Sequence, residues 1–298
     1  MAALQAARIE QIRAPVLRGL SRRKLGLLAL LYLVVLVVVA VGGSALTPAD
    51  PAAQDLRNRL LGPAWAPGGS WSHILGTDFL GRDVLSRIMA GARTSVLIGL
   101  SVVAWSGLVG SAAGMAAGVI GGRVESLVMA IADVLLAFPG ILLALAIVVM
   151  VGPGLLSVTV ALGLLSLGVY ARMARSVTLS VMGNAYVEAS VSLGASRTRL
   201  LLRDVLPNAI GPMLITASLE LARVILAEAA LSFLGLGVQA PTISWGLLLA
   251  EGRTYLGPAP WLVIAPGVPI FLTVLSTNIV VQWLRSAHDP TTGTLRAA

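Results

Sequence analysis

The chain has 298 residues, of which 57% are hydrophobic and only 11% are charged, and its formal net charge is +8. Because a soluble domain carries about 25% charged residues, lipid rather than water must solvate most of this apolar surface. The positive charge is not arranged as an aromatic and basic nucleic-acid-binding module, which argues against a role on RNA or DNA. Cysteine is absent, which excludes disulfides, thiolate metal sites and cysteine nucleophiles.

Six apolar stretches are long enough to cross a bilayer as helices, which takes about 20 residues each. They are Leu25–Leu46, Thr94–Ile120, Val124–Val151, Leu155–Tyr170, Pro212–Leu236 and Trp261–Trp283. The sequence therefore predicts an all-α membrane protein with six transmembrane helices. In the second stretch, Gly110, Gly114 and Gly118 share one helix face, which predicts close packing against another helix.

The first stretch has two interpretations. A basic start and the small residues that end at Ala45 are compatible with a cleaved signal peptide. The apolar run is about 20 residues long, however, whereas signal peptides have apolar runs of about 7–15 residues. This length favours an uncleaved transmembrane anchor.

Arginine and lysine indicate the orientation, because cytoplasmic segments are enriched in them. If the N-terminal tail is cytoplasmic, 14 of the 21 basic residues lie inside, 6 lie outside and Arg223 lies in a span. This excess predicts that both termini are cytoplasmic. The expected segments are a tail (1–24), a first helix (25–46), an external loop (47–93), a core (94–285) with a cytoplasmic loop (171–211), and a second tail (286–298).

The external loop ends in a helical pattern. Apolar residues recur at helical spacing in Phe79, Leu80, Val84, Leu85, Ile88 and Met89. Asp78 lies four residues before Arg82, and Asp83 lies four residues before Arg87. Both spacings favour ion pairs on a helix, and Thr77 could cap its start. We expect an amphipathic helix on the outer face before the second span.

Several kinds of active site are excluded. A phosphate-binding P-loop needs a lysine before Ser or Thr, whereas the only lysine, Lys24, precedes Leu25. Both histidines lie outside the spans, so an intramembrane serine protease lacks a base, and the spans lack an aspartate pair. With two histidines and no cysteine, no structural zinc site is expected. We expect no enzyme active site here, and six spans without an internal repeat fit a half-transporter driven from outside itself.

The cytoplasmic loop has a more specific pattern in the segment NAYVEASVSLGASRTRLLLRDVLPNAIGP (residues 184–212). Asn184 could cap a short helix, Gly194 permits a left-handed turn after it, and Ser196 could cap a second helix that runs to Leu206. A helix, a glycine elbow and a second helix suit docking into a cleft of a soluble partner. A generic basic loop that contacts lipid headgroups is the alternative.

This segment resembles the EAA loop of bacterial ABC importer permeases, in which Glu-Ala-Ala is followed by a glycine and then by Leu-Pro. The matching residues are Glu188, Ala189, Ser190, Gly194, Leu206 and Pro207. Ser190 replaces the third small residue of the triplet, and Asp204 stands where many families have an apolar residue. Three further segments are similar to dipeptide and oligopeptide permeases of the second-subunit type. They are HILGTDFLGRDVLSRIMAGARTSVLIGL (73–100), ADVLLAFPGILLAL (132–145) and EAALSFLGLGVQAPTISWG (228–246).

The resemblance implies the type I ABC importer permease fold in a bacterial plasma membrane. It implies three kinds of partner: a second permease subunit, ATP-binding cassette ATPase subunits that bind ATP and Mg, and an extracytoplasmic substrate-binding protein. This chain would hold no cofactor and would translocate short peptides. Nickel or another small solute is an alternative cargo, and a non-transporting membrane scaffold is the alternative class of function.

The resemblance also implies contact between the EAA loop and the ATPase. The candidate coupling residues are Glu188, Ala189, Gly194, Ala195, Arg197, Arg199, Leu206 and Pro207. Local capping and turn geometry would explain Glu188 and Gly194 without such a contact. The arginines could equally serve only to orient the chain in the membrane.

Charged residues inside spans each cost roughly 2.5–3.5 kcal/mol on insertion scales, so they should face protein or water. The candidates for the translocation path or a gate are Asp133, Glu220, Arg223 and Glu228. Glu220 and Arg223 lie three residues apart and could instead only neutralise each other. On the external side, Asp78, Arg82 and Asp83 could contact the binding protein, close an outer gate, or form only surface salt bridges.

Overall fold

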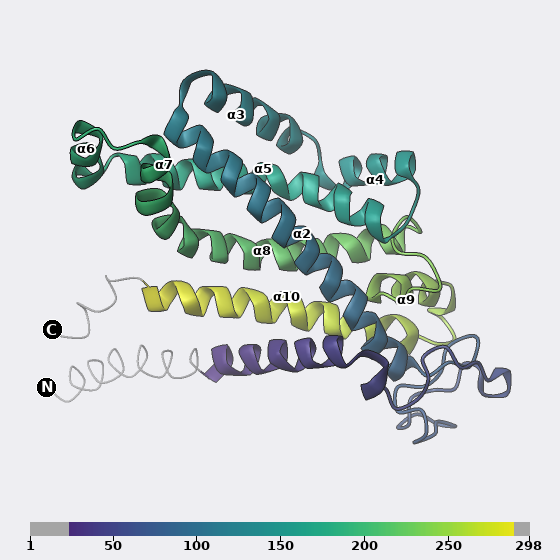
Figure 1. Cartoon of the computed structure of the whole chain (residues 1–298). Helices are drawn as coiled ribbons and strands as arrows, with labels where there is room; N and C mark the ends of the chain where they lie inside the picture. The colour runs from purple at the N-terminus through teal and green to yellow at the C-terminus, as the bar shows by residue number, and fades with distance from the viewer. Residues whose placement is uncertain (1–23, 289–298) are drawn as a thin grey trace, which may run out of the picture.

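The computed structural model describes residues 24–288, which are almost entirely helical (Figure 1). After a first helix, Lys24–Gly42, the elements are η1 (Gly43–Leu46), η2 (Leu56–Asn58), α2 (Val84–Ile120), α3 (Gly122–Ala137), α4 (Gly140–Val151), α5 (Leu155–Met182), α6 (Ala185–Ser192), α7 (Arg197–Arg199), η3 (Leu200–Val205), α8 (Leu206–Phe233), α9 (Trp245–Gly252), η4 (Arg253–Tyr255) and α10 (Trp261–His288). The all-α prediction is confirmed for this part of the chain.

Within residues 24–288, five helices are long and apolar enough to cross a membrane, and α3 with α4 makes a sixth crossing if the bent pair is one span. The third span expected at Val124–Val151 is divided into two helices, because α3 and α4 are bent by 92° at their junction. Proline lacks an N–H and disfavours helical backbone in the residue before it. Phe138, which precedes Pro139, is accordingly extended and ends α3.

The expected long cytoplasmic loop is mostly helical. α5 does not end near Tyr170 but continues to Met182, and the helix that starts at Arg197 continues without a break to Phe233. The prediction that the second helix of the loop ends at Leu206 is therefore wrong. The π-helical segment η3 ends at Val205, two residues before Pro207, and such a wide turn accommodates the missing N–H of a proline within a continuous helix.

The start of α2 also differs from the expected amphipathic helix. Asp83 caps α2, its Oδ2 accepting from the Ser86 N–H at 2.8 Å, whereas Thr77 lies in a bridge with Asp83 rather than at a helix start. Gly81 has a φ of +75°, and a Cβ there would lie 1.8 Å from the carbonyl oxygen of Asp55. This contact and the left-handed backbone exclude a helix through Gly81, so the helix begins at Val84 and continues directly into the second span.

The central packing is between α2 and α5, as the glycine spacing predicts. A Cβ at Gly114 would lie 2.1 Å from the carbonyl oxygen of Ala171, and one at Gly110 would lie 2.8 Å from that of Leu167. The backbones of the two helices approach closely because these glycines have no side chain. The expected small-residue contact is confirmed.

The two ends of the bundle differ in shape (Figure 1). At one end α6 projects beyond the long helices, and we call this the α6 end. At the other end residues 47–83 form an irregular lobe, and α9 lies nearby; we call this the lobe end. The first helix begins, and α10 ends, toward the α6 end (Figure 1). Separate buried clusters occupy the lobe end around Trp245 and the α6 end around Val187.

Candidate coupling surface and charged clusters

Helix α6 is held to the bundle by one buried side chain. Val187 is fully buried and belongs to a cluster with Leu200 and Val205. The remaining large apolar side chains are exposed, among them Tyr186, and Leu193 is 89% exposed. Since water solvates such side chains poorly, α6 presents an apolar surface that the described part of the chain does not cover.

The elbow after α6 has the predicted geometry. Gly194 has a φ of +80°, and a Cβ there would meet no atom within 4 Å. The position therefore requires glycine for its backbone conformation and not for space. Ser196 caps the following helix, its Oγ accepting from the Arg199 N–H at 3.3 Å, as predicted. Asn184 lies at the predicted N-cap position of α6, but its side chain makes no capping hydrogen bond, because its Nδ2 donates to the carbonyl oxygen of Val181 instead.

The charged residues of this region face outward. Glu188, Arg197 and Arg199 are exposed, and no ion pair within residues 24–288 involves them. Among the other candidate coupling residues, Ala189 and Pro207 are exposed, whereas Ala195 and Leu206 are half-buried against the cluster around Val187. This region thus has a buried base, the cluster around Val187, and an exposed tip, the outer face of α6 with the Gly194 elbow, which carries both charged and apolar side chains.

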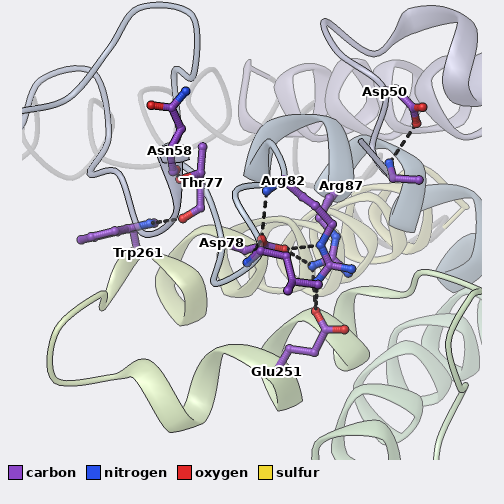
Figure 2. Close-up of polar contacts among 10 residues, drawn as sticks. Asp50, Asn58, Thr77, Asp78, Arg82, Arg87, Glu251 and Trp261 are labelled. Atoms are coloured by element: carbon purple, nitrogen blue, oxygen red, sulfur yellow. Dashed lines mark hydrogen bonds and ion pairs between the residues drawn. The ribbon is translucent and has the colours of Figure 1, made fainter. Parts of the chain in front are cut away.

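At the lobe end, Asp78 is the centre of a buried ionic cluster (Figure 2). Its Oδ2 accepts from Arg82 Nε and from Arg87 Nη1, both at 2.6 Å. Its Oδ1 accepts from the N–H groups of Leu80 and Arg82. Arg87 Nη1 also donates to Glu251 of α9 at 2.7 Å. The predicted Asp78–Arg82 pair is confirmed, but Asp78 is only 3% exposed, so the surface interpretation is wrong for it.

Asp83 belongs to a second buried group. Its Oδ1 lies 3.0 Å from His73 Nδ1, and its Oδ2 accepts from both the N–H and the Oγ–H of Ser86. The expected ion pair between Asp83 and Arg87 is wrong, because Arg87 turns toward Asp78. Like Asp78, Asp83 is enclosed by its own chain, so it too is not part of a surface salt bridge.

In the middle of α8, Glu220 and Arg223 form the predicted ion pair. Arg223 Nε donates to both oxygens of Glu220, and Nη2 donates to Oε2 at 2.6 Å. Nη2 also donates to Ser166 Oγ of α5 at 3.0 Å. The pair is asymmetric, because the Glu220 side chain is 7% exposed whereas that of Arg223 is 42% exposed.

Glu228 lies two turns further along α8 and is almost fully buried. Its Oε1 accepts from Ser232 Oγ at 2.7 Å and from Ser244 Oγ at 2.9 Å. Ser244 in turn caps α9 by accepting from the Leu247 N–H. Glu228 therefore connects α8 to the start of α9, and its Oε2 has no hydrogen-bond partner among the residues described.

Asp133 of α3 forms an ion pair with Arg172 of α5, and both side chains are more than half exposed. A second pair between the same helices joins Glu125 to Arg175.

Within residues 24–288, no group of His, Cys, Asp or Glu is arranged to hold a metal ion.

Sequence analysis missed several partners in these clusters. They are His73, Ser166, Arg172, Ser244 and Glu251. Most are separated from their partners by 16 to 169 residues, and a spacing rule for one helix cannot find them. The sequence did contain one indication of these partners, since a buried charge requires either an opposite charge or hydrogen-bonding groups around it.

Long apolar helices and a proline-broken span define a multi-pass helical membrane protein, and an exposed helical elbow lies at one end of it. A family model described as "Binding-protein-dependent transport system inner membrane component" matches residues 110–292. A second model, the N-terminal transmembrane domain of oligopeptide transport permease C, matches residues 14–63. The chain belongs to the family of binding-protein-dependent inner-membrane transport components. It is thus the permease subunit of an ABC importer, as the resemblance predicts.

Relatives are similar over nearly the whole chain. The di/tripeptide transport system permease protein DppC of Pseudomonas aeruginosa is 42% identical over 92% of this chain and 90% of its own length. The dipeptide transport system permease protein DppC of Escherichia coli is 40% identical over 91% of this chain and 90% of its own length. A solved structure of the MetNI methionine ABC transporter covers 63% of this chain and 94% of the solved chain, with 20% identity and a TM-score of 0.47.

Proposed function

We propose that this permease imports short peptides and that α6 with the Gly194 elbow transmits the motion of partner ATPases to the spans. The observation that carries the coupling role is the exposed tip of α6 on a base fixed by Val187. The relatives named as dipeptide and di/tripeptide permeases support the cargo. Nickel or another small solute remains the alternative cargo.

The complex that this function requires has further subunits. A second permease completes the path, ATPase subunits bind ATP and Mg, and an extracytoplasmic protein delivers the cargo. This chain supplies no catalytic residue and no cofactor site. The coupling residues proposed to contact the ATPase are Glu188, Ala189, Gly194, Ala195, Arg197, Arg199, Leu206 and Pro207.

The helix that follows the elbow suits mechanical transmission. From Arg197 to Phe233 it is continuous over 37 residues, which corresponds to about 55 Å. A tilt imposed at the elbow would therefore be passed toward the lobe end along one continuous helix, which includes the π-helical segment η3 and Pro212. On the way it would move Arg223 and Glu228, which contact α5 and the start of α9.

Gly194→Val tests this coupling role. A β-branched residue in a left-handed conformation is strained by at least about 1–2 kcal/mol, but open space surrounds the site, so the protein should still insert and bind the loaded binding protein. In liposomes with all subunits, peptide uptake and the stimulation of ATP hydrolysis by loaded binding protein should both be lost. Gly194→Asn is the matched control, because asparagine tolerates this conformation, and it should retain most of both activities.

Glu188→Lys tests the same surface through its charge. Glu188 is exposed and makes no ion pair in the described part of the chain, so its reversal should leave folding unchanged and weaken only a contact with a partner. Normal peptide uptake by both the Glu188→Lys and the Gly194→Val variants would refute the coupling role. Uptake of nickel but not of dipeptides by the unaltered complex would instead favour the alternative cargo.

We propose that both termini and the α6 end are cytoplasmic, which the 14-to-6 distribution of basic residues supports. The natural chain has no cysteine, and Ser72 of the lobe and Ser192 of α6 are both exposed. In right-side-out membrane vesicles, a membrane-impermeant thiol reagent should label Ser72→Cys but not Ser192→Cys. The reverse labelling pattern would overturn the proposed orientation.

A further inference from the structure

Helix α8 exposes a charged side chain at membrane depth. Arg223 lies ten residues before the end of α8 at Phe233, or about 15 Å, which is about half the thickness of the hydrocarbon core. Its side chain is 42% exposed, and Leu219 and Leu226 on the same helix face are exposed as well. Because lipid tails solvate a guanidinium poorly, water or another protein must cover this face.

The guanidinium of Arg223 is fixed on one side and free on the other. Nε and Nη2 donate to Glu220 and to Ser166, whereas Nη1 has no hydrogen-bond partner within residues 24–288. Tyr170, one helical turn after Ser166 on α5, is 1% exposed, and its hydroxyl has no partner in the described structure. The cluster therefore retains donors that its own residues do not use.

The two members of the Glu220–Arg223 ion pair differ in exposure. Glu220 is buried beneath Arg223, so the positive member faces outward and the negative member faces the protein interior. The planar fork of arginine matches a carboxylate better than a lysine ammonium does. An immobilised guanidinium with a free edge is thus suited to an anionic group that passes along this face.

We propose that Arg223 is a specificity-determining residue of the translocation path and binds the side-chain carboxylate of acidic peptide cargo. This inference rests on the proposed function and concerns only the carboxylate of an Asp or Glu side chain, because the C-terminal carboxylate is common to every peptide. A carboxylate of the second permease subunit could use the same chemistry, and the experiment distinguishes the two sources.

The test compares three dipeptides that share the C-terminal carboxylate, namely Ala-Glu, its near-isostere Ala-Gln and the cationic Ala-Lys, in reconstituted complexes with saturating binding protein. The variant is the double change Glu220→Gln with Arg223→Gln, which leaves no single buried charge. Uptake of Ala-Glu relative to Ala-Gln should fall about fivefold, the equivalent of a partly exposed charge pair worth about 1 kcal/mol. Uptake of Ala-Lys relative to Ala-Gln should not fall, and Arg223→Lys should retain part of the preference for Ala-Glu.

The matched control is the double change Glu125→Gln with Arg175→Gln, which removes one of the two ion pairs between α3 and α5. It should change uptake of the three dipeptides by one common factor. If the Arg223 double variant also changes all three by one factor, the carboxylate belongs to a partner subunit or the role is structural, and the inference fails. If the unaltered complex imports none of the three dipeptides, the proposed function fails instead.

A second measurement needs no transport. Leu226→Cys places a single thiol in this chain one turn from Arg223, and Leu31→Cys places one on the exposed first helix. Small anionic thiosulfonates should modify the thiol at position 226 faster than cationic ones, and this preference should vanish in the Glu220→Gln, Arg223→Gln background. No modification at position 226, or equal rates with both reagents, would overturn the inference, and position 31 should not react.

Discussion

Charged residues are buried at one end of this permease and exposed at the other. At the lobe end, Asp78 and Asp83 are buried and each accepts several hydrogen bonds from its own chain. At the α6 end, Glu188 and Arg197 are exposed and make no ion pair in the described residues. At the lobe end the chain therefore supplies the partners of its own charged residues, whereas the α6 end presents charges and apolar side chains that suit a contact with another protein.

Because of this difference, substitutions at the two ends should affect different properties, namely protein stability and transport. Removing a buried charge strands its partner in a low-dielectric environment, and the loss is large. Removing an exposed, unpaired charge changes stability by about 0.5 kcal/mol or less. Changes at the lobe end should therefore lower stability, and changes at the α6 end should lower transport in a folded protein.

The largest effect is expected for Asp78→Ala. The change removes the acceptor of Arg82 and of the buried Arg87, so Arg87 retains only Glu251 as a charged partner. Thermal unfolding of the detergent-purified protein should show a loss of about 3–5 kcal/mol, typical of a broken buried ion pair. Glu188→Ala is the control at the α6 end and should leave the melting temperature unchanged. Equal melting temperatures for the two variants would refute the contrast between the ends.

An intermediate effect is expected in the middle of α8. Arg223→Gln leaves the buried carboxylate of Glu220 without its cation, whereas Glu220→Gln leaves an arginine that is partly accessible to water. Arg223→Gln should therefore cost about 2 kcal/mol more in stability than Glu220→Gln. The double change should recover part of this loss. Additive losses across the four proteins of this cycle would mean that the two charges do not interact.

Sequence analysis located five of the six expected spans and the elbow because both depend on local chemistry. The position of a span follows from its apolar run, and the turn at Gly194 follows from the absence of a Cβ. The bend at Pro139 has a local signal that hydropathy alone overlooks, since the run is apolar on both sides of it. The same is true of the lobe, where Gly81 stops the helix that the apolar spacing of Leu80 and Val84 favours.

The partners of the charged residues could not be predicted in the same way. Arg87 pairs with Glu251, which is 164 residues away, and only the packing of α9 against α2 brings the two together. A spacing of four residues favoured a pair between Asp83 and Arg87 because it assumed one continuous helix. Once the loop at Gly81 folds back, Asp78 rather than Asp83 faces Arg87.

The smallest effect is expected for Ser196→Ala at the α6 end. Its hydroxyl caps the helix with one hydrogen bond to the Arg199 N–H at 3.3 Å, and loss of a serine cap costs about 1 kcal/mol. The helix continues through Leu200, which is buried, so fraying should stop there and global unfolding should not change. Hydrogen exchange should therefore accelerate about fivefold at the amide of Arg199, which donates to the Ser196 hydroxyl, and not beyond Leu200; fivefold is the rate equivalent of about 1 kcal/mol. Faster exchange in the lobe as well would show that the two ends are coupled even in the isolated chain, and the α6 end would then not be an independent docking element.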